Sequence, residues 1–261
     1  MRGLLRACHP GPTVVVTAVA VMLGAGFGLD AGVLTLIGAT VLMGQLSIGW
    51  SNDWLDAERD TAARREDKPT ATGGVSVTTV RTAAVTFGAL SIPASLAWGW
   101  RPGTCHLVLV ASGWLYNLGL KRSLLSPLPY LLGFGALPAY VALVADIDPQ
   151  WWLVTAGALL GLSAHFANAA PDVITDRALG VWGAPQRLGT RVSLGISLVV
   201  LAAAGVLAIS QLEAGTEVAL AAVLLPTALG LAVVLRGSVK AVFPLVMCAA
   251  LIDVGMLIVV A

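Results

Sequence analysis

A hydrophobic stretch at residues 32–51 runs directly into the acidic sequence NDWLDAERD at residues 52–60. The same order recurs further along the chain, where the apolar residues 151–170 lead into NAAPDVITD at residues 168–176. Both acidic segments contain the pattern N-x-x-x-D-x-x-x-D. Side chains four residues apart lie on one face of an α-helix. The sequence therefore predicts two membrane-crossing helices that each end in a face of carboxylates.

The composition of the chain is that of an integral membrane protein. Of its 261 residues, 57% are hydrophobic and 11% are charged, and the mean hydropathy is +0.88. Soluble domains carry about 25% charged residues. The apolar stretches of roughly 17–25 residues predict an all-α, polytopic membrane helical bundle of about nine transmembrane helices in a single domain, residues 1–261. The helices are expected at residues 12–29, 32–51, 77–97, 104–120, 126–145, 151–170, 191–209, 215–235 and 241–260.

The charged residues between these helices indicate the orientation of the chain. Fourteen of the fifteen basic residues lie in the N-terminal segment and in the loops after the second, fourth, sixth and eighth predicted helices, and the exception is Arg101. The opposite loops hold Asp30, Asp146, Asp148, Glu213 and Glu217. Because basic loops stay in the cytoplasm, we expect a multi-pass cell-membrane protein with its N-terminus, both acidic motifs and their cap loops in the cytoplasm, and its C-terminus outside.

Charge and cysteine content argue against other classes of protein. The net charge is +1, so no basic surface points to a nucleic-acid partner. The three cysteines, Cys8, Cys105 and Cys248, lie far apart without C-x-x-C spacing, which favours neither a disulfide framework nor a zinc site. The partner that the composition predicts is the lipid bilayer.

The two acidic motifs form an internal repeat. One constant offset aligns Asn52, Asp56 and Asp60 with Asn168, Asp172 and Asp176. The same offset aligns Asp53 with Ala169, so the second copy has one acid fewer. The repeat predicts two related halves, about residues 12–125 and 126–261, that each contribute one metal-binding helix end.

So many carboxylates beside lipid require cationic compensation. Two carboxylate faces turned toward each other at a bilayer surface suit divalent metal ions bridged by a diphosphate. Mg²⁺ takes a few carboxylates and leaves positions for phosphate oxygens, and it neutralises a departing diphosphate. A prenyl diphosphate combines such a head with an apolar tail that suits a groove among the helices. The predicted metal ligands and catalytic residues are Asp53, Asp56 and Asp60 for one ion, and Asp172 and Asp176 for another.

Cationic side chains are expected to touch the phosphates directly. Arginine suits bidentate phosphate contact, whereas lysine acts as a point charge. The candidates that lie near the motifs are Arg64, Arg65, Lys68, Lys121, Arg177 and Arg187. Arg187 is equally consistent with a role in holding its loop, and Arg177 with a role as a topology signal.

Four segments together resemble the UbiA superfamily of intramembrane aromatic prenyltransferases. NDWLDAERD is similar to the family's first acidic motif, and REDKPTATG, through Arg65, Lys68, Pro69 and Gly73, to its R-x-x-[RK]-P-x-x-x-G segment. YNLGLK, from Tyr116 to Lys121, resembles a Y-x-x-x-x-K motif, and PDVITDRALG followed by RLG resembles the second acidic motif. The resemblance covers most of the chain, from about residue 9 onward.

This resemblance implies nine helices around a cavity capped on the cytoplasmic side, and Mg²⁺-dependent prenyl transfer from a polyprenyl diphosphate donor to an acceptor. It also implies that Tyr116 and Lys121 lie near the diphosphate and that Asn52 shapes the metal site. The residues expected to bind substrate are Asn52, Arg65, Lys68, Tyr116, Lys121, Asn168 and Arg177. The sequence departs from the family pattern at Ala169, which replaces an acid, at Pro171 inside the second motif, and at Lys68, which replaces the more usual arginine.

Two other functions stay open at the level of sequence. A terpene cyclase of the same superfamily needs the same metal site, and a cation-coupled transporter also uses intramembrane charges. The acidic residues at helix ends and the equal orientation of the repeats count against transport. Neither the acceptor nor the donor chain length is encoded in a readable motif.

Several other polar residues have a structural interpretation beside a functional one. Glu58, Arg59, Glu66 and Asp67 are expected to be solvated loop charges. His165 shares a helix face with Asn168 and Asp172, so it either lines the cavity or is a buried, hydrogen-bonded histidine. Asp253, within the ninth predicted helix, is a structural partner or a cavity contact. Trp54 lies inside the first motif, where it could touch substrate, and His9 and His106 have no obvious partner in the sequence.

Overall fold

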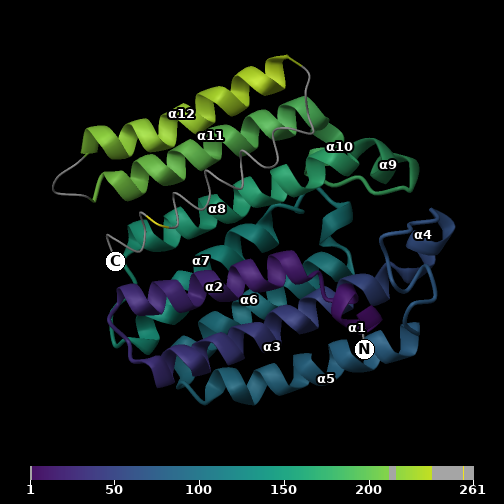
Figure 1. Ribbon diagram of the computed structural model, residues 1–261, viewed down its shortest axis with the longest axis horizontal. Coiled ribbons are helices and arrows are strands. Elements are labelled where there is room, and N and C mark those ends of the chain that lie inside the picture. Colours follow the sequence, from purple (N-terminus) through teal and green to yellow (C-terminus); the bar gives the residue numbers. More distant parts are fainter. Residues whose placement is uncertain (1, 212–215, 237–254, 256–261) are drawn as a thin grey trace. The chain divides into compact units, whose positions relative to one another are not determined.

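The computed structural model describes residues 2–211, 216–236 and 255, and these residues form helices without a strand (Figure 1). The all-α prediction is therefore confirmed. Eight long helices in the described part of the chain match the predicted ones to within a few residues. They are α2 (Pro10–Gly26), α3 (Ala31–Leu55), α5 (Val77–Leu96), α6 (Trp100–Leu118), α7 (Leu128–Val144), α8 (Trp151–Ala169), α11 (Thr190–Ile209) and α12 (Thr216–Leu235). The ninth predicted helix, apart from residue 255, and with it Asp253, lies outside the described residues.

Six short helices lie beside the ends of the long ones. They are α1 (Arg2–Ala7), α4 (Ala57–Ala62), η1 (Leu120–Arg122), η2 (Ala170–Asp172), α9 (Val173–Ala178) and α10 (Ala184–Leu188). Among the described residues, three helical stretches are long and apolar enough to cross a membrane: α3, Trp151–Ala178 and α11. Three further apolar helices, α2, α7 and the Val223–Leu235 part of α12, are shorter.

Local signals in the sequence set where several helices begin. The Asp30 carboxylate accepts hydrogen bonds from the backbone N–H groups of Gly32 (2.8 Å) and Val33 (3.1 Å), and so caps α3. The Ser76 hydroxyl accepts from the N–H of Thr79 at 3.1 Å and caps α5 in the same way. These caps satisfy N–H groups that have no partner within the first turn of a helix.

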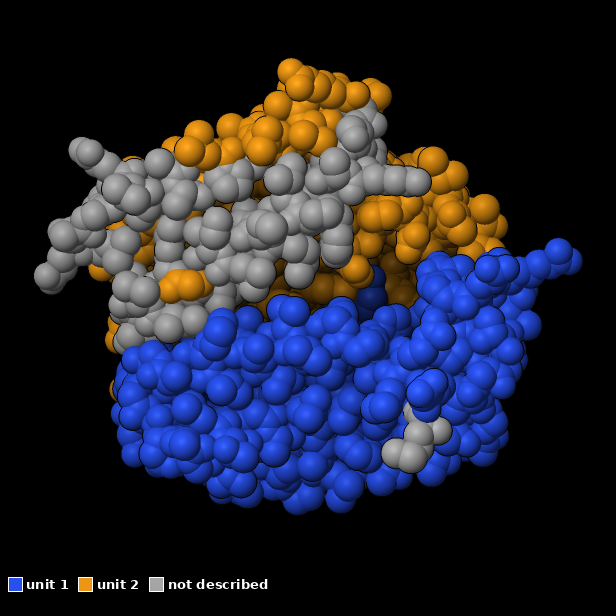
Figure 2. Space-filling view, viewed as in Figure 1, with its two compact units in different colours: residues 1–119, 140–147 blue, residues 120–139, 148–261 orange. Residues whose placement is uncertain are grey.

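The chain forms two compact units (Figure 2). The first comprises residues 1–119 and 140–147, and the second comprises residues 120–139 and 148–261. In the first unit α3 packs against α2, α5 and α6, and in the second α11 packs against α8 and α12. Each unit thus carries one acidic motif, at the end of α3 in the first and of α8 in the second.

Small apolar cores lie beside both motifs. In the first unit, a buried cluster joins the N-terminal segment to α3 and α5, and its members are Ala7, Cys8, Trp50, Val80 and Ala84. In the second unit, a cluster joins the end of α8 to α11 and α12, and its members are Ala167, Ala170, Leu194, Leu198, Leu201 and Val234. Burial of these side chains holds the motif-bearing ends of α3 and α8 in place.

Each acidic motif bends in the structure, whereas the four-residue spacing of its acids predicted one continuous helix face. The first motif bends at Asp56 (φ −95°, ψ −2°), between α3 and α4, and the second bends at Asp172 (φ −96°, ψ 0°), between η2 and α9. In the second motif Pro171, within η2, provides a physical reason, because proline cannot continue the hydrogen-bond ladder of a helix. The motif carboxylates therefore extend from two successive helical segments in each unit.

Candidate active site

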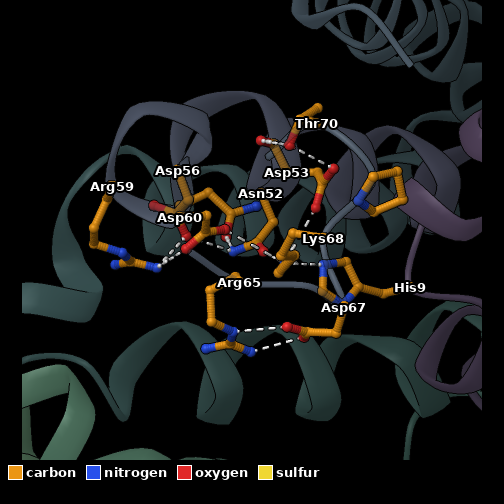
Figure 3. Close-up of polar contacts among 12 residues, drawn as sticks. His9, Asn52, Asp53, Asp56, Arg59, Asp60, Arg65, Asp67, Lys68 and Thr70 are labelled. Atoms are coloured by element: carbon orange, nitrogen blue, oxygen red, sulfur yellow. Dashed lines mark hydrogen bonds and ion pairs between the residues drawn. The ribbon is translucent and has the colours of Figure 1, made fainter. Parts of the chain in front are cut away.

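The three acids of the first motif are almost completely buried at the junction of α3 and α4 (Figure 3). Asp53 lies in the last turn of α3, Asp56 at the bend and Asp60 in α4, and their exposed fractions are 0%, 3% and 1%. Three buried carboxylates in one segment are costly unless charge compensates them. The compensation in this structure comes from the chain itself.

Lys68 provides the first compensating charge. Its Nζ atom lies 3.2 Å from Asp53 Oδ1 and 3.9 Å from Asp60 Oδ2. The same ammonium donates a hydrogen bond to Asn52 Oδ1 at 3.2 Å and lies 2.9 Å from His9 Nε2. Lys68 itself is buried. The lysine predicted to contact phosphate thus lies among the predicted metal ligands (Figure 3).

Arg59 provides the second compensating charge. Its Nη2 atom lies 2.8 Å from Asp56 Oδ2 and 3.5 Å from Asp60 Oδ1. The expectation that Arg59 is a solvated loop charge is therefore wrong, because its guanidinium packs onto two buried carboxylates. Asp67, another expected loop charge, is exposed but pairs with Arg65 through two hydrogen bonds of 2.8 and 2.9 Å.

Amide and hydroxyl groups fix the orientation of these side chains. Asn52 donates through Nδ2 to Asn117 Oδ1 at 3.1 Å and to Asp56 Oδ2 at 3.4 Å. Asn117, which is buried in α6, donates in turn to the Ser51 hydroxyl at 2.8 Å. Thr70 donates to Asp53 Oδ2 at 3.0 Å. Asn52 therefore connects Lys68, Asp56 and Asn117.

The surroundings shift the pKa values of three side chains at this end of the first unit. Burial raises the pKa of Asp60 above its usual value, while Lys68 and Arg59 act in the opposite direction. The hydrogen bonds from Arg65 lower the pKa of Asp67 to about 2. Burial, and then the positive charge of Lys68, lower the pKa of His9 to about 4. His9 is therefore uncharged at neutral pH.

The residues present fit Mg²⁺ in their chemistry. Asp53 Oδ1 and Asp60 Oδ2 are buried oxygens that accept no hydrogen bond, and both face the Lys68 ammonium. Within the described residues, no three His, Cys, Asp or Glu side chains converge as a metal-binding group. Mg²⁺ needs one or two carboxylates together with phosphate oxygens and water, so the two facing oxygens suit it.

The second motif lies in the second unit and is more exposed. Asp172 and Asp176 are half-buried, and Asn168, at the end of α8, is exposed and hydrogen-bonded to Tyr130. Gln186, buried in α10, donates to Asp176 Oδ2 at 2.8 Å. The structure thus links the last acid of this motif to the loop that follows it.

Both arginines of this loop contact its backbone. Arg177 donates through Nε to the carbonyl of Gln186, and its guanidinium lies 5.9 Å from the ring centroid of Trp182. Arg187 donates to the carbonyl of Trp182 at 3.0 Å, in agreement with its alternative role of holding the loop. Gly183 packs closely on η1, because a Cβ atom there would lie 2.5 Å from the Lys121 carbonyl oxygen.

Three other residues singled out in the sequence lie as follows. Tyr116 is half-buried in α6 of the first unit, and Lys121 is buried in η1 of the second. His165 is buried, with Nε2 3.1 Å from the Ser126 hydroxyl, which matches its interpretation as a hydrogen-bonded histidine.

Sequence reasoning missed the contacts of four residues with the motifs or with Lys68. His9 contacts Lys68, Thr70 and Asn117 contact the first motif, and Gln186 contacts the second. His106 also has a partner, since its Nδ1 lies 2.7 Å from the Ser95 hydroxyl. Thr70, Asn117 and Gln186 lie within or beside the segments that resemble the family motifs, and this position could have indicated their contacts. No sequence pattern indicated the contact of His9, because its partner Lys68 is 59 residues away.

Comparison with known proteins identifies the class of protein. The model of the UbiA prenyltransferase family matches residues 13–242. The chain therefore belongs to the UbiA prenyltransferase family, and it is an integral membrane protein. Among curated proteins, none matches it in sequence.

Solved structures share the fold at low sequence identity. An apo UbiA homologue from Aeropyrum pernix K1 is 20% identical, with a TM-score of 0.76 over 95% of this chain and 98% of the other. A UbiA homologue from Archaeoglobus fulgidus bound to GPP and Mg²⁺ is 15% identical, with a TM-score of 0.72 over 97% and 99%. A structure of a digeranylgeranylglyceryl phosphate synthase is 15% identical, with a TM-score of 0.69 over 99% and 97%.

Proposed function

We propose that this protein transfers a prenyl group from a polyprenyl diphosphate to an acceptor within the membrane, with Mg²⁺ as cofactor. The observation that carries the proposal is the buried group of Asp53, Asp56 and Asp60 with its two cations, at the end of α3 in a chain of this family. The Archaeoglobus fulgidus relatives that bind GPP or DMAPP together with Mg²⁺ support it.

The catalytic roles follow from the side chains present. Asp53, Asp56 and Asp60 would hold one Mg²⁺, and Asp172 and Asp176 another. When bound, Mg²⁺ acts as a Lewis acid that neutralises charge developing on the departing diphosphate. Burial of the first motif excludes water, which protects an allylic cation from hydrolysis and strengthens each electrostatic contact.

The remaining residues bind and orient the donor. The cationic side chains that would contact phosphate are Lys68, Arg65, Lys121 and Arg177, with Tyr116, Asn52 and Asn168 as further polar contacts. Arg65 holds Asp67 through two hydrogen bonds, which is the bidentate geometry with which a guanidinium also binds phosphate. We place both motifs on the cytoplasmic side, on the basis of the basic residues in their loops.

Purified protein in detergent with Mg²⁺ and a panel of prenyl diphosphates tests this function. Prenyl transfer that requires an added acceptor is expected, with products identified by mass spectrometry. A cyclic hydrocarbon formed without acceptor would instead mark a terpene cyclase, and a linear hydrocarbon or prenyl alcohol would mark a hydrolase-like activity. No diphosphate release with any donor contradicts the proposal.

Variants test the role of the first motif. Asp53→Asn and Asp56→Asn each keep the shape of the side chain. We expect kcat to fall by about 10²-fold or more, because the charge that develops in the transition state is no longer stabilised. Glu58→Gln is the matched control, since Glu58 lies in the same motif but is exposed. Equal activity of Asp56→Asn and Glu58→Gln would remove Asp56 from the site.

A further inference from the structure

The Lys68 ammonium is held by a residue from outside both acidic motifs. His9 Nε2 lies 2.9 Å from Lys68 Nζ, closer than Asn52 Oδ1 or Asp53 Oδ1, each of which lies 3.2 Å from the same atom (Figure 3). An ammonium has only donors to offer. His9 Nε2 must therefore accept the hydrogen bond, which requires a neutral imidazole with its proton on Nδ1.

The backbone at His9 is strained and firmly anchored. His9 has left-handed angles (φ 55°, ψ 67°) directly before Pro10, although a residue before proline favours extended backbone. The neighbouring Cys8 carbonyl accepts from the Thr13 hydroxyl at 2.8 Å, and Gly49 of α3 packs against the Cys8 backbone. Such strain persists where the surroundings enforce it, often at functional sites.

The preceding segment is tied to the same helix as the motif. Trp50 of α3 donates through its indole N–H to the carbonyl of Leu4 at 2.8 Å. Ala7 and Cys8 lie in the buried cluster with Trp50. The segment Arg2–His9 therefore presents the His9 imidazole to Lys68 from a fixed position on α3.

A lysine at this position needs such a support. Arginine carries a rigid fork of donors, whereas a lysine ammonium is a point charge on a flexible four-carbon stem. His9 and Asn52 accept hydrogen bonds from the Lys68 ammonium, and the Asp53 and Asp60 carboxylates are its ion-pair partners.

We propose that His9 is a positioning residue for the donor: it accepts a hydrogen bond from Lys68 and holds this ammonium at the first motif, where it meets the diphosphate. This proposal rests on the proposed prenyl transfer for its kinetic consequence only. The contact itself is tested without donor or metal.

Limited reductive methylation measures how firmly Lys68 is held. His9→Asn suits left-handed backbone and has a shorter side chain, so it removes the contact and keeps the turn. We expect Lys68 to be modified several-fold faster in this variant, as measured by peptide mass spectrometry. Lys121 and Lys240, the other lysines of the chain, are internal references, and Arg6→Gln, an exposed change in the same segment, is the control.

Two outcomes of the labelling overturn the proposal. An unchanged Lys68 rate would mean that His9 does not hold it, and an equal acceleration of all three lysines would mean that the protein is merely loosened. His9→Gly, which also suits left-handed backbone, replaces His9→Asn if that variant does not fold.

Steady-state kinetics test the consequence for donor binding. A lost hydrogen bond to a charged group predicts a donor KM about tenfold higher in His9→Asn, with kcat at saturating donor little changed. In a Lys68→Met background the same substitution should have no effect, because His9 acts through Lys68. Equal KM increases in both backgrounds overturn the proposal. If the wild-type protein shows no prenyl transfer, the proposed function is wrong. The labelling experiment still tests whether His9 holds Lys68.

Discussion

At the scale of single residues, cationic side chains of the protein itself neutralise the carboxylates of the first motif. Asp53 and Asp60 face Lys68, and Asp56 and Asp60 face Arg59. Removing one partner of a buried ion pair leaves an uncompensated charge, which costs far more than the pair contributes. The two cations therefore maintain a site that contains three buried acids before any metal ion or donor arrives.

Arg59→Met tests this arrangement. The substitution keeps much of the side-chain volume and leaves Asp56 without its 2.8 Å partner, so we expect the free energy of unfolding to fall by about 1.5–3 kcal/mol. Added Mg²⁺ should restore more of the melting temperature in this variant than in the wild type, because it supplies the missing charge. Thermal unfolding in detergent measures both effects.

Arg64→Met is the control for this experiment. Arg64 carries the same charge as Arg59 but is exposed, in the turn that follows α4. The melting temperature of this variant should therefore stay close to that of the wild type. Equal losses in Arg59→Met and Arg64→Met would show that net charge, and not the contact with Asp56, stabilises this end of the protein.

At the scale of elements, the two motifs bend at corresponding residues. Asp56 and Asp172 occupy the same position of the repeat and have nearly the same backbone angles, although only the second is preceded by a proline. The proposal of two related halves, about residues 12–125 and 126–261, is supported by this agreement. The compact units divide the chain differently, at residues 119, 139 and 147.

The long helices and the acidic motifs were predictable from sequence, whereas the contacts of the motifs were not. Apolar stretches and turn residues are local signals, and they placed α3 and α8 to within a few residues. The bend at Asp56 and the partial burial of Arg59 depend on how the end of α3 packs. The contact of His9 with Lys68 joins two segments 59 residues apart, and no local pattern encodes it.

Gly49→Ala tests the packing of the N-terminal segment on α3. A Cβ atom at residue 49 would overlap the backbone of Cys8, so we expect an overpacking cost of about 1–3 kcal/mol in the free energy of unfolding. Because Cys8 precedes His9, methylation of Lys68 should also accelerate. Gly11→Ala is the control, since a Cβ atom there meets nothing within 4 Å, and unchanged stability of Gly49→Ala would contradict the close contact.

At the scale of the whole molecule, each compact unit carries one motif in a different environment. The acids of the first unit are buried with Lys68 and Arg59, whereas Asp172 and Asp176 of the second are half-buried. Basic residues gather in the loops that follow both motifs, which is the basis for placing these loops in the cytoplasm. The first unit has exposed residues at both predicted membrane surfaces, at residue 66 on one side and residue 147 on the other.

Cysteine labelling in intact cells tests this orientation. In a chain with Cys8, Cys105 and Cys248 replaced by alanine, Glu66→Cys reports the loop after the first motif and Ile147→Cys the loop after α7, since both positions are exposed. We expect a membrane-impermeant maleimide to label residue 147 in intact cells and residue 66 only after permeabilisation, because lysine and arginine retain their loops in the cytoplasm. Retained prenyl transfer in isolated membranes shows that each chain is inserted normally. Labelling of residue 66 in intact cells would reverse the orientation and place the motif, with its donor, on the outer surface.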